Sequence, residues 1–286
     1  VHTGLALLPP PVTAHSRLVL SLLPLYRGPF AGFLSHVVAH RERRGLEGAR
    51  RGLEELLASG AGAFADIVFK DEVMDFLLQE SPLPGVAFYE VFAPEPSLAE
   101  EVYRAVRRKV EAWRRREGKV KVGLSPHAPY SVSPPLLKRL AEWARAEGLP
   151  LMVHAAESPE EVAFLAQTPW PPPGTTPVRH LHALGVLGPT TLLVHGVQVD
   201  EEEVGLLAET GTKVVLCPRS NANLEVGEAP LALYAKHGVE LALGTDSRGS
   251  SPDLDVKNEA RFLWGRAEPR LLVRALTRGG YRALGL

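Results

Sequence analysis

The chain has 286 residues, of which 45% are hydrophobic and 23% are charged, a composition typical of a globular protein. Its formal net charge of −1 argues against a nucleic-acid binder, and no apolar run approaches the roughly 20 residues of a membrane span. The single cysteine, Cys217, excludes an internal disulfide and, with no signal peptide at the start, favours a reducing cytoplasmic location.

Short apolar runs alternate along the chain with amphipathic helical stretches. The runs are rich in β-branched and aromatic residues, as buried parallel strands are, and they span residues 10–15, 62–69, 85–92, 119–125, 149–156, 190–196, 211–217 and 238–245. Helical periods between them span residues 98–117, 133–148, 158–167 and 200–211. Several of these begin after Ser or Asp and end at Gly, as capped helices do.

Eight strands that alternate with helices predict an α/β fold, a (β/α)8 TIM-like barrel formed by residues 1–286 as a single domain. A doubly wound open sheet is the alternative, but no glycine-rich phosphate loop follows any strand. Prolines at 168–177 predict a rigid loop near the barrel mouth. Abundant Arg, Leu, Ala, Pro and Glu with scarce Met and Cys are typical of a thermophile.

Ionisable residues stand at the ends of several predicted strands, where the active sites of such barrels lie. His15, His127, His154 and His195 follow apolar runs, and Asp246 follows the last one. A lone histidine of this kind is more simply a packing residue, but three histidines and an aspartate at one mouth favour a site. Imidazole and carboxylate ligands suit zinc, with a position left open for water. Five further histidines are expected at the surface or in packing roles: His36, His40, His180, His182 and His237.

Five motifs resemble the amidohydrolase superfamily, in its chlorohydrolase- and deaminase-like branch. They are "LSPHAPYSVS" (124–133), "LMVHAAES" (151–158), "LLVHGVQV" (192–199), "VVLCPRSNANL" (214–224) and "LALGTDSRGS" (241–250). Within that branch, "TPVRHLHALGVL" and "CPRSN" are similar to enzymes that deaminate 6-aminodeoxyfutalosine, an adenosine-like intermediate of menaquinone synthesis.

The resemblance implies deamination of an amino-purine nucleoside-like small molecule by attack of a metal-activated water. It implies one divalent metal, zinc or iron, with His15, His154 and Asp246 as ligands. It also implies that Glu157 carries a proton to the leaving amine while His195 and Asp246 orient and deprotonate the water. The residues implied to line the substrate are His127, Glu90, Arg219 and Asn221.

The chain departs from the family pattern at two places. The His-x-His metal motif reads His15-Ser16-Arg17, and Val19 stands where an acidic residue usually follows. The family's small β-sandwich, built from both chain ends, is expected to be largely absent. Apolar surface that this domain would otherwise cover favours a homodimer.

Arg17 leaves two alternatives open. Zinc lowers the pKa of its water by about 8 to 9 units, whereas a neighbouring arginine shifts a pKa by only about 1 to 3 units, so Arg17 cannot replace the ion. Either Arg17 turns away and His15, His154 and Asp246 hold the metal of a working deaminase, or Arg17 pairs with Asp246 or Glu157. In the second case the barrel is metal-free or catalytically weak, and acts as a small-molecule binding or vestigial protein.

Overall fold

The computed structural model describes residues 8–286, and its eight strands form one parallel sheet in which each strand pairs with the next along the chain. They are β1 (Val12–Thr13), β2 (Ala63–Val68), β3 (Gly85–Val91), β4 (Val120–Pro126), β5 (Leu151–Ala155), β6 (Thr191–His195), β7 (Lys213–Leu216) and β8 (Leu241–Leu243). The ends of the sheet also meet, because the Ala14 N–H donates to the Leu243 carbonyl at 2.8 Å and a β-bridge joins Ser16 to Asp246. The predicted (β/α)8 barrel is therefore confirmed, with nearly complete closure.

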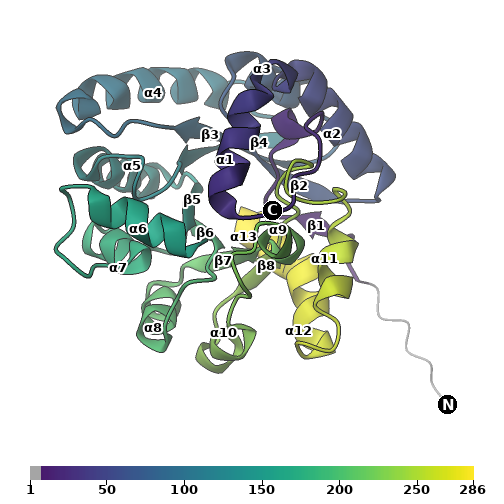
Figure 1. Ribbon diagram of the computed structural model, residues 1–286. Coiled ribbons are helices and arrows are strands. Elements are labelled where there is room, and N and C mark those ends of the chain that lie inside the picture. Colours follow the sequence, from purple (N-terminus) through teal and green to yellow (C-terminus); the bar gives the residue numbers. More distant parts are fainter. Residues whose placement is uncertain (1–7) are drawn as a thin grey trace.

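Most of the helices surround these strands on the outside of the barrel, whereas α1, α9 and α13 lie across its ends (Figure 1). The helices are α1 (Phe30–Ala39), α2 (Leu46–Ala58), α3 (Asp71–Glu80), α4 (Ala99–Arg114), α5 (Pro134–Glu147), α6 (Pro159–Gln167), α7 (Pro177–Ala183), α8 (Glu201–Thr210), α9 (Pro218–Asn223), α10 (Leu231–His237), α11 (Val256–Phe262), α12 (Pro269–Arg274) and α13 (Gly280–Leu284). The four predicted helical periods correspond to α4, α5, α6 and α8. Within residues 8–286, no helix combines the length and hydropathy needed to cross a membrane.

Local capping explains where several of these elements begin and end. Asp200 and Glu203 form a reciprocal capping box at the start of α8, which ends at Gly211 in the left-handed conformation. The predicted strand 238–245 is shorter in the structure, Leu241–Leu243, because Gly238 has a φ of 69° and closes α10. The strand can therefore start only after this turn.

Alternate residues of the strands face the two sides of the barrel wall. In β2, Ala63 and Ile67 pack in a cluster inside the barrel, whereas Phe64 and Val68 pack in the cluster between strands and helices. Cys217 is a buried free thiol in the inner cluster. Because side chains fill the interior, a functional cavity must lie at an end of the barrel.

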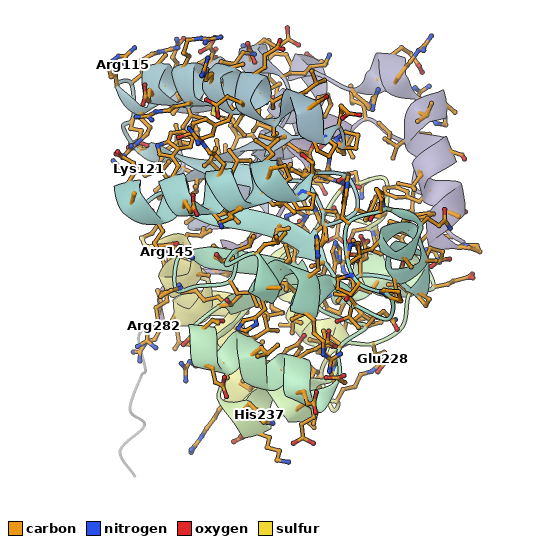
Figure 2. All side chains as sticks on the ribbon, turned by 90° about the vertical axis from the view of Figure 1, so that its left-hand side faces the viewer. Arg115, Lys121, Arg145, Glu228, His237 and Arg282 are labelled. Carbon is orange, nitrogen blue, oxygen red and sulfur yellow. The ribbon has the colours of Figure 1, made fainter. Side chains whose placement is uncertain are left out.

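Helix α1 marks the end of the barrel at which the strands finish. It lies in front of the strands in Figure 1 and along one side of the molecule in Figure 2. Arg115, Lys121, Arg145 and Arg282 lie on the opposite side in Figure 2. Lys121 is near the start of β4, so that side is the end where the strands begin. The two ends of the barrel therefore differ, and α1 belongs to the mouth.

Candidate metal and catalytic site

Ionisable side chains converge at the mouth, where they line a cavity of about 410 Å³. The group comprises Arg17, Glu90, His127, His154, Glu157, His195 and Asp246, and the fully buried His15 has its ring centroid 5.1 Å from that of His154. His195 and Asp246 have φ angles of 78° and 57°, in the left-handed region. Such a conformation costs about 1–3 kcal/mol for a residue with a side chain and is concentrated at functional sites.

Three buried imidazoles present their ring nitrogens to one point. Ligand atoms of His15, His154 and His195 all lie within 4.8 Å of one another. His154 Nδ1 donates to the His127 carbonyl at 3.0 Å, and His195 Nδ1 donates to Asn221 Oδ1 at 2.9 Å. Because these oxygens can only accept, the proton of each neutral ring lies on Nδ1, and Nε2 of His154 and of His195 keeps its lone pair. Burial lowers the pKa of all three imidazoles, which favours their neutral, metal-binding form.

Asp246 supplies a carboxylate beside the imidazoles. Its Oδ2 accepts hydrogen bonds from the Ser220 and Ser250 hydroxyls, both at 2.8 Å, while Oδ1 lies 3.5 Å from His15 Nε2. Burial acts to raise the pKa of Asp246, but the interaction with His15 and the charges around it hold that pKa well below its ordinary value. Asp246 is therefore ionised, with one oxygen facing the imidazoles.

Arg17 points into the mouth and not away from it. Its Nη2 donates to Glu90 at 3.0 Å, and its Nη1 lies 3.5 Å from His154 Nε2. Neither alternative for Arg17 describes this position fully, because the side chain does not turn away and its partner is Glu90 on β3 in place of Asp246 or Glu157. The other Glu90 oxygen is buried without a hydrogen-bond partner among the described residues. Glu90 thus offsets the charge of Arg17 in addition to lining the cavity.

Glu157 stands beside His195, with Oε1 at 3.5 Å from His195 Nε2. Burial raises the pKa of Glu157 to about 8, so this carboxyl group is largely protonated at neutral pH. The Glu157 backbone N–H donates to Glu161 at 2.6 Å, which fixes the start of α6 next to the mouth. The site therefore contains a neutral carboxylic acid next to a neutral imidazole.

These donors fit a divalent cation. Within the described part of the chain His15 Nε2 is buried without a hydrogen-bond partner and His195 Nε2 carries a lone pair, while the lone pair of His154 Nε2 faces Arg17 Nη1 at 3.5 Å. Neutral imidazole with carboxylate is a donor set that zinc binds. His15 and His154 would hold the ion together with Asp246, whose Oδ1 lies 3.5 Å from His15 Nε2, and a ring nitrogen of His195 lies within 4.8 Å of those of the two histidines.

A family model described as "Amidohydrolase family" matches residues 34–286 of the chain. The chain belongs to the amidohydrolase family. An aminodeoxyfutalosine deaminase of Deinococcus radiodurans is 40% identical over 99% of this chain and 74% of its own length. A 5-methylthioadenosine/S-adenosylhomocysteine deaminase of Carboxydothermus hydrogenoformans is 30% identical over 89% of this chain and 60% of its own length. The resemblance inferred from the five motifs is confirmed.

Solved structures agree with this amidohydrolase assignment. A zinc-bound adenosine deaminase of Xanthomonas campestris superposes with a TM-score of 0.83 at 26% identity, covering 97% of this chain and 67% of that one. An aminofutalosine deaminase of Helicobacter pylori in complex with methylthio-coformycin has a TM-score of 0.79 at 24% identity, covering 97% and 74%. The second likeness shows the fold alone.

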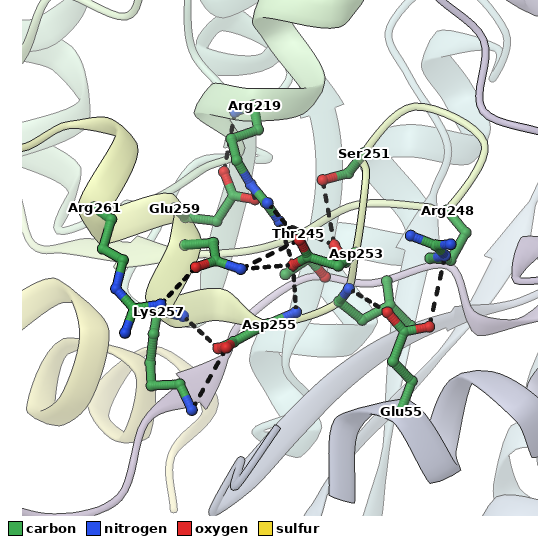
Figure 3. Close-up of polar contacts among 12 residues, drawn as sticks. Glu55, Arg219, Thr245, Arg248, Ser251, Asp253, Asp255, Lys257, Glu259 and Arg261 are labelled. Atoms are coloured by element: carbon green, nitrogen blue, oxygen red, sulfur yellow. Dashed lines mark hydrogen bonds and ion pairs between the residues drawn. The ribbon is translucent and has the colours of Figure 1, made fainter. Parts of the chain in front are cut away.

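Two residues expected to line the substrate have other contacts in this amidohydrolase. The Arg219 guanidinium is held by Asp253 and Glu259, each with a nitrogen–oxygen distance of 2.7 Å (Figure 3), and is not among the residues lining the cavity. Asn221 is buried and supports His195 through its amide oxygen. His127 does line the cavity, and its ring stacks on Phe92 with centroids 4.1 Å apart.

The other histidines of residues 8–286 do not line the cavity. His36, His40 and His237 are partly buried on or directly after α1 and α10, and His182 is exposed on α7. His180 is buried, with its Nε2 lacking a hydrogen-bond partner among the described residues. The proline-rich residues 168–176 form the predicted loop between α6 and α7.

Sequence reasoning missed Asp66, although an acid within the apolar run "AFADIV" was a usable signal. Its Oδ1 accepts from the Leu18 backbone N–H at 2.8 Å and from the Ser16 hydroxyl at 3.2 Å. These bonds fix the segment that carries Arg17. Burial raises the pKa of Asp66 to about 7, although the hydrogen bonds from Leu18 and Ser16 act to lower it.

Asp66→Asn is expected to reduce the pH dependence of folding stability. Because the carboxyl pKa is about 7 in the folded protein and 3.8 ordinarily, the folded state holds this proton more tightly. The free energy of unfolding should therefore fall as pH rises from about 4 to 7, by up to about 4 kcal/mol from this group. Urea unfolding of the wild-type protein and of Asp66→Asn at several pH values in this range measures the fall in the free energy of unfolding. An equal fall in the two proteins would contradict the prediction.

Proposed function

We propose that this amidohydrolase deaminates the purine ring of an adenosine-like nucleoside and uses zinc as its metal. The foremost candidate substrate is 6-aminodeoxyfutalosine. The observation that carries the proposal is the meeting of three neutral imidazoles and an ionised carboxylate with a protonated Glu157 in one cavity. The named relatives are deaminases of aminodeoxyfutalosine, 5-methylthioadenosine and S-adenosylhomocysteine, which supports this substrate class.

Each polar residue has a role in the proposed reaction. His15, His154 and Asp246 would hold a divalent ion, which would lower the pKa of a water and so make it nucleophilic at neutral pH. His195 Nε2 carries a lone pair, so it is suited to accept a proton from the attacking water. Glu157 donates its proton to the departing amine, which leaves as ammonia while a carbonyl forms on the ring. His127 provides a flat wall for the ring of the substrate.

The position of Arg17 supports a second candidate, a metal-free barrel that binds a small molecule without turnover. Its Nη1 is 3.5 Å from the His154 nitrogen that would bind the ion. In this case the purified protein should contain almost no zinc, even after incubation with an excess. Near-stoichiometric zinc, measured by plasma mass spectrometry, would exclude this candidate.

Ammonia release from 6-aminodeoxyfutalosine, 5-methylthioadenosine and adenosine, with and without added zinc, tests the proposed reaction. Glu157→Gln should lower kcat by about 100-fold or more, because an amide cannot donate the carboxylic proton. Zinc content should be unchanged in this variant. Glu160→Gln, which alters a neighbouring acid outside the cavity lining, is the matched control and should retain activity. If the zinc-loaded wild-type protein releases no ammonia from any of the three, the proposed function is wrong.

A further inference from the structure

The outer part of the cavity has a wall made of apolar side chains. Phe30, Phe33 and Val37 of α1 line it, as do Phe69 after β2 and Phe92 after β3. Phe30 and Phe33 are buried, whereas Phe92 is about half exposed (54%). Such a wall favours an aromatic or aliphatic group, and a cavity of about 410 Å³ is of the size that binds small ligands. The reactive ring at the imidazoles therefore has space beside it for an apolar arm.

One cation in this apolar part of the cavity lacks an acidic partner. Arg44 lines the cavity, and its guanidinium lies 5.7 Å from the centroid of the Phe69 ring. Among residues 8–286 its side chain forms no ion pair, and the only side-chain hydrogen bond is a 3.5 Å contact from Nε to the Arg41 carbonyl. Arg17, the other cation of the cavity, is paired with Glu90. Arg44 is therefore the cation of the cavity lining that can accept a new anionic partner.

The acids of the cavity lie elsewhere. Glu90 pairs with Arg17, Glu157 adjoins His195, and Asp246 adjoins His15. Glu157 is largely protonated, Glu90 is compensated by Arg17, and Asp246 accepts hydrogen bonds from two serine hydroxyls. The charged groups at the imidazole end therefore already have partners, whereas Arg44 can pair with an acidic group of a ligand whose amine-bearing ring lies at the imidazoles.

We propose that Arg44 is a specificity-determining residue that binds an anionic group at the end of an apolar arm of the substrate. This inference rests on the proposed function, because it assumes that the reactive ring occupies the imidazole end. The guanidinium presents a planar set of donors that can form two hydrogen bonds to a carboxylate, and its carbon lies 5.7 Å from the centroid of the Phe69 ring. A neutral arm of the same shape gains the apolar contacts but not these bonds.

Binding of a matched pair of ligands tests this proposal without requiring turnover. The pair is a 5′-arylthio adenosine with a carboxylate on the aryl ring, and its methyl ester, both measured by titration calorimetry against the zinc-incubated protein. The wild-type protein should bind the acid about 10- to 100-fold more tightly than the ester. Arg44→Gln should abolish this preference while leaving binding of the ester within about twofold, and Arg44→Lys should retain part of it.

Arg43→Gln is the control, because it removes the same charge from an exposed neighbouring residue. It should keep the preference for the acid. Equal binding of acid and ester by the wild-type protein, an undiminished preference in Arg44→Gln, or no binding of either ligand would overturn the proposal. Ammonia release from the ester is measured separately: turnover of both ligands at equal rates would leave the proposed deamination intact while contradicting the role of Arg44.

Discussion

Replacing Glu90 with glutamine is expected to weaken zinc binding by about 10³-fold. Glu90 is the carboxylate that pairs with Arg17, at 3.0 Å, and the Arg17 side chain is only 15% exposed. Without this negative charge, an uncompensated guanidinium remains near the nitrogens that bind the ion. Charges of +1 and +2 about 5 Å apart repel by roughly 7 kcal/mol at an effective dielectric of 20. If movement of Arg17 relieves part of this repulsion, about 4 kcal/mol of it remains, which is equivalent to about 10³-fold in zinc affinity.

Competition with a calibrated zinc chelator measures this effect. Glu161→Gln is the matched control, because Glu161 is also a buried acid of the cavity lining but bonds to the Glu157 backbone and not to Arg17. It should change zinc affinity little. An unchanged affinity in Glu90→Gln would mean that Glu90 does not offset the charge of Arg17. If the wild-type protein itself binds no zinc, the metal-free candidate replaces the proposed deaminase.

Replacing Arg17 with histidine is expected to strengthen zinc binding by about 10³-fold or more. The substitution removes the cation beside His154 Nε2 and adds an imidazole on the same strand end. It also restores the His-x-His pair that the family resemblance implies, His15 and residue 17. Arg17→Gln separates the loss of the cation from the gain of the imidazole, because it removes the charge without adding a ligand. Its zinc affinity should lie between those of the wild-type protein and Arg17→His.

The double variant Arg17→His with Glu90→Gln gives a further check on this prediction. Once the guanidinium is absent, loss of the Glu90 charge should have a much smaller effect on zinc affinity than it has in the wild-type background. The same chelator competition measures all four proteins. Additive effects of the two substitutions would show that Arg17 and Glu90 act on the ion independently, contrary to their contact at 3.0 Å.

Much of the fold was predictable because its signals are local. A strand buried on both faces is a continuous apolar run, and the run at 85–92 corresponds to β3 (Gly85–Val91). Helix ends follow from neighbouring residues, as at Asp200 and Gly211 of α8. The short β8 was less predictable, because its start depends on the left-handed turn at Gly238.

The donor set at the mouth was also predictable in part. Parallel strands finish at one end of a barrel, so residues that follow apolar runs must come together there. His154, His195 and Asp246 do so, and His15 joins them. Arg219 shows the limit of this reasoning. It follows β7, yet Asp253 and Glu259, 34 and 40 residues later, hold its guanidinium, and such distant pairings have no signature in the local sequence.

The sequence by itself determined the barrel, the imidazoles and the carboxylates at its mouth, because strand periodicity and connection order decide which residues reach that end. Only the tertiary structure decided what Arg17 does. A long side chain at the centre of a barrel can reach acids from several strands, and its partner is the acid that lies within its length. That acid is Glu90, while α1 and the segment after it bring Arg44 to the outer cavity. Both outcomes depend on distances between elements far apart in the chain, which no local pattern encodes.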